Sequence, residues 1–224
     1  ADPLTLLTVL VAAVLCGQFP LTGTPGPEAA TLLGAIAAVP VFLAAIVRGT
    51  DGSGRGFVDG LKPQILLVIG CIALFSGVVT VATMGAPSCT TDPGQISFAV
   101  LSGPVLLLDS AVGLWVARLV RRRRPALVAG ILVVIAYVAW LLALLWHEPS
   151  FRILSQPFLV IDGDLLQGQS LRPALVAFRT STLLYALAFC LGGAAQFPAT
   201  RRGGFSARND TNLSLWGVAA AVFL

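Results

Sequence analysis

Asp109 is the residue whose type and position point most directly to chemistry, because it interrupts a long apolar segment around Pro104 to Leu114. A carboxylate near the centre of a bilayer costs about 2.5 kcal/mol or more, so it must face protein or water, be protonated or find a partner. One interpretation is a proton or cation relay, and the other is an acid that fixes helix packing. A relay normally uses further acids, and the other apolar segments carry none at depth, so the packing interpretation is favoured.

The residues around Asp109 predict the surface on which it lies. At helical spacing it shares one face with Ser102, Val105 and Gly113. Such a narrow stripe of small residues is typical of a helix that packs closely against another helix in a membrane.

Arg179 is the candidate partner of Asp109, and its own helical face carries Thr182, Ala186, Cys190 and Gly193. At a rise of 1.5 Å per residue, Arg179 lies about 8 Å below the outer surface and Asp109 about 20 Å below it. A direct pair would therefore need both side chains to stretch. We expect Arg179 to extend outward instead, with its charged head near the surface, and keep the ion pair as a hypothesis.

A long, apolar loop covers residues 147–173 and offers a second set of acids. It contains Asp162-Gly163, a hairpin or tight-turn signal between apolar residues. We expect the loop to form an external cap or short hairpin on the outer membrane face. Asp162 and Asp164 suit a divalent cation by type, but two carboxylates fall far short of a calcium-binding loop, which favours a solvated turn.

The remaining reactive residue types do not assemble into a known catalytic or metal motif. The single histidine begins His147-Glu148-Pro149, which lacks the second histidine of a zinc protease. The four cysteines contain no CxxC pair, so neither a metal cluster nor a disulfide framework is expected. The sequence predicts no enzyme activity, no metal and no cofactor.

The elements that carry these residues follow from composition and hydropathy. With 57% apolar and 11% charged residues, the chain differs from soluble domains, which are about 25% charged. A spanning helix needs about 20 mostly apolar residues, and six runs qualify. We therefore predict an all-α, polytopic transmembrane bundle with spans near residues 4–21, 29–47, 63–84, 96–120, 126–146 and 174–197.

The two ends of the chain carry further signals. A seventh apolar run opens at Leu213 and reaches only Leu224, so we expect an incomplete span over 213–224. The chain begins at Ala1 without a methionine, which suggests processing or truncation there. Trp115, Trp140, Trp146 and Trp216 lie toward segment ends, as anchors at the membrane interface do.

Orientation is predicted from the basic residues, since short cytoplasmic loops retain Lys and Arg. Eleven of the 14 basic residues fall in alternate loops, which places the N-terminus in the cytoplasm. The densest group, Arg121, Arg122, Arg123 and Arg124, is interpreted as a topology anchor and a contact for anionic lipid. Nucleic acid is not an expected partner, because no aromatic residues alternate with these arginines.

Several motifs together suggest a family. They are Gln18-Phe-Pro-Leu-Thr-Gly-Thr-Pro-Gly-Pro-Glu28, Cys89, Ser102-Gly-Pro, the arginine cluster and a segment with Pro, Phe and Gly that leads through Arg179. Over most of its length the chain resembles the multi-pass membrane domain found ahead of peptidase-MA-like (gluzincin) regions in bacterial envelope proteins. The resemblance implies that this chain is an anchor and that metal chemistry belongs to a following soluble domain.

The sequence therefore favours a non-catalytic integral membrane module. It would be an anchor for a C-terminal domain or a packing subunit that associates with other membrane subunits. The abundance of Ala, Gly and Arg with a single Lys suggests a bacterial source and hence the cytoplasmic membrane. The alternative is a small transporter or channel subunit that uses Asp109.

Overall fold

The computed structural model describes residues 3–18, 26–51, 56–83, 94–147, 152–154, 160–162 and 173–197. The predicted all-α class is confirmed. The helices are α1 (Pro3–Cys16), α2 (Pro27–Asp51), α3 (Phe57–Thr83), α4 (Gly94–Ser97), a π-helix (Phe98–Ser102), α5 (Gly103–Val120), α6 (Arg123–His147) and α7 (Pro173–Gln196). The incomplete span predicted over 213–224 lies outside the described residues.

Five helices in the described part of the chain are long and apolar enough to cross a membrane: α2, α3, the π-helix with α5, α6 and α7. Six full spans were predicted, and the first forms a shorter helix. At 1.5 Å per residue, the 14 residues of α1 extend about 21 Å, less than the ~30 Å of a hydrocarbon core. Helix α1 ends in a tightened turn, where Gln18 N–H donates to the Leu15 carbonyl.

The fourth predicted span contains a change of helix type that hydropathy does not indicate. Residues Phe98–Ser102 form a π-helix, in which Gly103 N–H donates to the Phe98 carbonyl. Pro104 follows directly, and a proline ring clashes with the preceding turn of a regular α-helix. The wider π turn accommodates that ring and lets α5 continue along the same segment.

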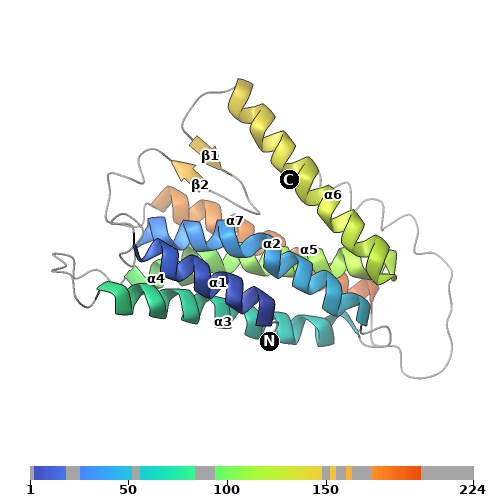
Figure 1. The fold of residues 1–224 in the computed structure, drawn as a ribbon. Helices are drawn as coiled ribbons and strands as arrows, with labels where there is room; N and C mark the ends of the chain where they lie inside the picture. Colours follow the sequence, from blue (N-terminus) through green and yellow to red (C-terminus); the bar gives the residue numbers. More distant parts are fainter. Residues whose placement is uncertain are drawn as a thin grey trace.

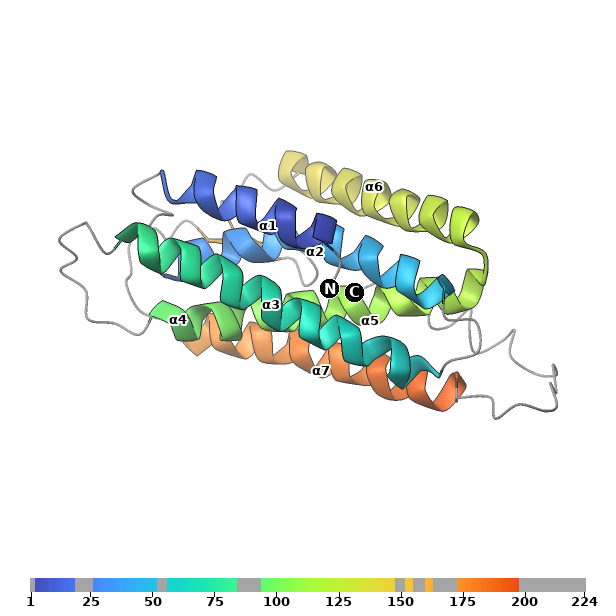
Figure 2. The same ribbon diagram turned by 60° about the horizontal axis from the view of Figure 1, so that its bottom comes forward.

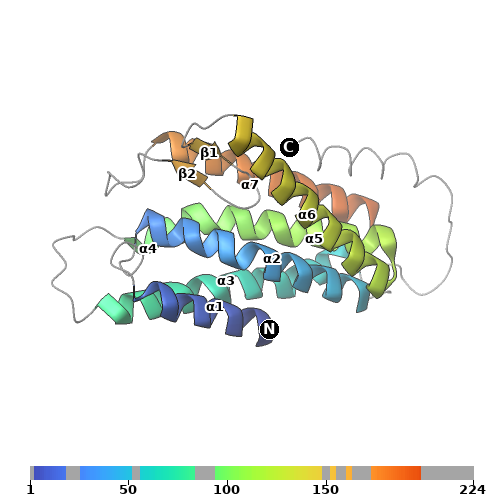
Figure 3. The same ribbon diagram turned by 45° about the horizontal axis from the view of Figure 1, so that its top comes forward.

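Helix α5 lies at the centre of the bundle, among α2, α3 and α7 (Figure 1; Figure 2). In the spanning window of Phe98–Val120, 72% of residues are buried, compared with 11% for the window of α6. Helix α6 packs on α2 and α5 through its first half, with Ala126 and Leu127 against Phe42 and Ile46. Toward its end α6 diverges from the bundle (Figure 1; Figure 3).

Two short strands lie in the long loop, near the first turns of α7 (Figure 1; Figure 3). Strand β1 (Arg152–Leu154) pairs antiparallel with β2 (Val160–Asp162), which places the β-branched Ile153 opposite Ile161. The hairpin agrees with the sequence, but its turn was misplaced. Asp162 is a strand residue opposite Arg152, and the strands are joined through residues 155–159.

Candidate functional site

The predicted small-residue face of α5 packs against α2. The Ser102 hydroxyl donates a hydrogen bond to the Ala30 carbonyl of α2. A Cβ atom added to Gly113 would lie 2.6 Å from the Phe42 carbonyl oxygen and 2.8 Å from the Ala45 Cβ atom. Only glycine permits so close an approach of the two backbones, which is how small residues join membrane helices.

Asp109 lies between these two contacts along the same face of α5. Its side chain is 4% exposed, so the carboxylate is inside the bundle. The Oδ2 atom has no hydrogen-bond partner among the described residues. A buried carboxylate of this kind is stable only with a compensating charge or proton.

Arg179 supplies a charge from α7. Its side chain is 1% exposed, and the expectation that it extends outward to the surface is therefore wrong. The guanidinium lies 5.5 Å from the centroid of the Phe178 ring. Thr182 and Ala186, which the helical spacing places on the same face of α7, are also buried. The tight packing of this face draws Arg179 into the bundle.

The charges of Asp109 and Arg179 interact across the boundary between α5 and α7. Tyr137 of α6 also contributes to the electrostatic surroundings of Arg179. Groups of three helices therefore interact electrostatically here, although Tyr137 itself is only partly buried. The attraction of the guanidinium offsets only part of the cost of burying the carboxylate.

The inner half of α7 is held by different contacts, which the sequence did not indicate. Trp115 was predicted to anchor at the interface, but it is buried, and its Nε1–H donates to the Phe189 carbonyl at 2.8 Å. Phe189 and Phe197 pack edge-on against its ring. Next to them, Phe57 N–H donates to the Phe197 carbonyl. A buried indole N–H needs a hydrogen-bond acceptor, and the Phe189 carbonyl of α7 supplies it.

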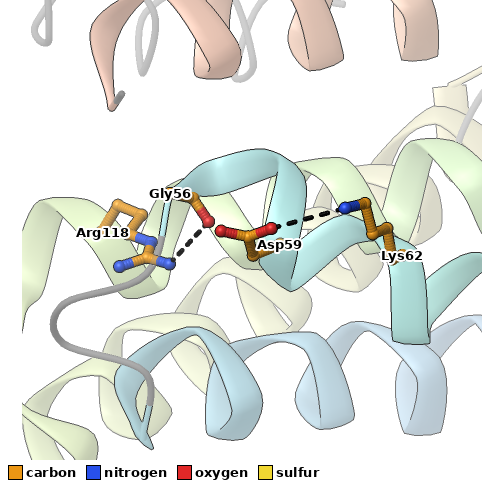
Figure 4. Close-up of polar contacts among 4 residues, drawn as sticks. All are labelled: Gly56, Asp59, Lys62 and Arg118. Carbon is orange, nitrogen blue, oxygen red and sulfur yellow. Dashed lines mark hydrogen bonds and ion pairs between the residues drawn. The ribbon is translucent and has the colours of Figure 1, made fainter. Parts of the chain in front are cut away.

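The basic residues gather where α2, α3, α5 and α6 end or begin. Arg48 donates to the Pro63 carbonyl at 3.1 Å. Figure 4 shows Arg118 donating to the Gly56 carbonyl at 3.3 Å, beside an ion pair of 3.5 Å between Asp59 and Lys62. These bonds join α5 to the start of α3 and α2 to α3. We call this part of the molecule the basic end.

The four predicted lipid-contacting arginines lie where α5 meets α6: Arg121 and Arg122 connect the helices, and Arg123 and Arg124 begin α6. All of Arg121 to Arg124 are exposed. Arg121 adopts a left-handed conformation with φ of 58°, and its N–H caps α5 by donating to the Ala117 carbonyl. Arg123 lies 3.8 Å from Asp51 of α2, with both side chains more than half exposed. The turn therefore presents its positive charge outward from the basic end.

Two further candidate acids were predicted in the long loop. Asp162 lies in β2, and Asp164 lies outside the described residues. Within the described ranges, no three His, Cys, Asp or Glu residues come together in a group that could hold a metal ion.

Comparison of the chain with known protein families, with curated proteins and with solved structures finds no match. The arrangement of Asp109 and Arg179 must therefore be interpreted from its own chemistry.

Proposed function

We propose that this chain is a non-catalytic module of a bacterial cytoplasmic membrane, with its N-terminus in the cytoplasm. It acts as a packing subunit of a larger membrane complex or as an anchor for a further domain. The main support is that polar side chains inside the bundle bind other helices of the same chain. Ser102, Trp115 and Arg118 donate to backbone carbonyls of other elements, and Asp109 faces the charge of Arg179. The three hydrogen bonds each join two elements of the bundle.

The two forms of this role differ in what they predict for the native protein. The anchor form is the one that the resemblance to the membrane domain ahead of peptidase-MA-like regions implies. The packing form requires other membrane chains. Native mass spectrometry after mild extraction from the source membrane distinguishes them: a single longer polypeptide supports the anchor, and stoichiometric partner chains support the subunit. Isolated chains of 23.2 kDa, with no partner, would contradict both.

Anionic lipid is the proposed partner at the basic end. Each exposed arginine near a charged surface contributes about 1 kcal/mol to the attraction of acidic lipid. Replacing Arg121 to Arg124 with glutamine should reduce the phosphatidylglycerol that is retained after extraction. The variant Lys62→Gln, whose lysine already pairs with Asp59, is the matched control and should retain more of it. Equal retention in both variants would remove the arginine cluster from lipid binding.

A transporter or channel subunit is the second candidate function. One observation favours it: Oδ2 of the buried Asp109 has no hydrogen-bond partner among the described residues. Proton flux into liposomes that disappears in Asp109→Asn, but persists when the exposed Asp51 is changed to Asn, would support this function. Flux at the level of empty liposomes, for both the native chain and Asp109→Asn, is the result that the packing role predicts.

A further inference from the structure

Gln64 of α3 is a buried polar residue that neither the packing contacts nor the charge pair uses. Its side chain is 0% exposed. Both amide atoms, Nε2 and Oε1, lack a hydrogen-bond partner among the described residues. An amide has two N–H donors and an oxygen acceptor, and leaving such groups unpaired in the interior costs about 1–3 kcal/mol each.

The neighbours of Gln64 on α3 show which helices it faces. Phe57 and Gly60 lie on the same face, seven and four residues earlier. A Cβ atom added to Gly60 would lie 3.2 Å from Leu114 of α5. One added to Gly193 of α7 would lie 2.6 Å from the Phe57 ring. Gln64 therefore projects toward the junction of α3 with α5 and α7, which lie side by side in Figure 2.

The register of these helices indicates what lies at the same depth. Helix α5 runs antiparallel to α3, with Leu114 beside Gly60 and Gly103 beside Ile72. Between these two contacts, four residues along α3 from Gly60 and about four residues back along α5 from Leu114, Ser110 and Ala111 lie at the depth of Gln64. Helix α7 also runs antiparallel to α3, with Gly193 beside Phe57. Gln64 lies seven residues after Phe57, so the residue at its depth on α7 is Ala186, seven residues before Gly193. The alanines are small, and the Ser110 hydroxyl, which donates to the Leu106 carbonyl at 2.8 Å, keeps lone pairs for another donor.

We propose that Gln64 is the anchor of an internal water site at the junction of α3, α5 and α7. A water molecule both donates and accepts, so it can bond the Gln64 carbonyl, the Gln64 NH₂ group and the Ser110 oxygen. Buried waters typically make about three hydrogen bonds to polar groups that protein atoms leave unsatisfied. Asp109 is not part of this site, because it lies on the face of α5 that carries Ser102 and Gly113 rather than on the face of Ser110.

The polar groups nearest to this site along α3 lie toward the basic end. One turn from Gln64 in that direction, a Cβ atom on Gly60 would lie 3.9 Å from Nη2 of Arg118. The same nitrogen donates to the Gly56 carbonyl, close to the partly exposed Asp59 (Figure 4). Beyond Gln64 the same face becomes apolar, with Leu67, Cys71 and Phe75 all buried in the core. On this face of α3, Gln64 is therefore the last polar residue before the apolar core.

Water-edited solid-state NMR of the isotopically labelled full chain in lipid bilayers tests this proposal. The Gln64 side-chain NH₂ signal is assigned by its loss in Gln64→Leu. It should gain magnetisation from water several-fold sooner than Val68, which lies one turn further along α3 and is buried. Gln18, which is exposed, is the positive control.

Two outcomes would overturn the proposal. The first is a Gln64 signal that builds no faster than that of Val68 in the native chain, a result that does not depend on any variant folding. The second concerns Ser110. The proposal predicts that the early transfer of magnetisation from water to Ser110 falls in Gln64→Leu, while the transfer to Gln18 stays unchanged. Early transfer to Ser110 that is independent of Gln64 would show that the amide does not hold the water.

Discussion

Asp109 and Arg179 show how far single residues can be interpreted from sequence. The need of Asp109 for protein surroundings followed from its place in an apolar segment, and so did the small-residue face on which it lies. The burial of Arg179 did not follow. Counting residues from a helix end gives depth, but it does not show that the face of Arg179, with Thr182 and Ala186, packs inward. That choice is made by tertiary contacts between helices distant in sequence.

Trp115 permits a prediction about one hydrogen bond. Trp115→Phe keeps most of the ring but removes the Nε1–H that donates to Phe189. We expect a loss of about 0.5–1.5 kcal/mol of stability, which lowers Tm by a few degrees in a chain of this size. Thermal unfolding in detergent measures it. Trp146, which is 87% exposed, is the control, and an equal shift in Trp146→Phe would show that the bond does not matter.

At the scale of elements, long apolar runs predicted which segments become helices, and five of the six proved long enough to span. Features that depend on local geometry were not visible. The π-helix before Pro104 and the strand position of Asp162 depend on backbone hydrogen bonds that hydropathy does not encode. The sequence also did not predict that α5 lies at the centre, because the most buried span, Phe98–Val120, is less apolar than the largely exposed α6.

The interface of α2 and α5 depends on the absence of a side chain at Gly113. In Gly113→Ala the new methyl group would meet a backbone oxygen and a Cβ atom of α2, which cannot move without shifting the helix. We expect a loss of about 1–3 kcal/mol. Gly77 of α3 is the control, because its added Cβ would meet nothing within 4 Å, and Gly77→Ala should be neutral or slightly stabilising. Equal stability of both variants would contradict this packing.

At the scale of the whole molecule, the basic end provides the prediction of orientation. Arg122, at the turn between α5 and α6, should lie on the cytoplasmic side, and Gln18, after α1, on the opposite side. In a cysteine-free background, Gln18→Cys should react with an impermeant thiol reagent in intact cells. Arg122→Cys should react only after permeabilisation. The reverse labelling pattern would invert the proposed topology.

The central claim is that Asp109 and Arg179 stabilise the bundle as a pair. A double-mutant cycle with Asp109→Asn and Arg179→Gln, measured by reversible unfolding in mixed micelles, tests it most directly. Each single variant leaves the other charge buried and should lose about 3 kcal/mol or more. The double variant should lose less than the sum, by about 0.5–3 kcal/mol. The exposed pair Asp51→Asn with Arg123→Gln is the control, with an expected coupling below about 1 kcal/mol. Additive losses at Asp109 and Arg179 would contradict the account.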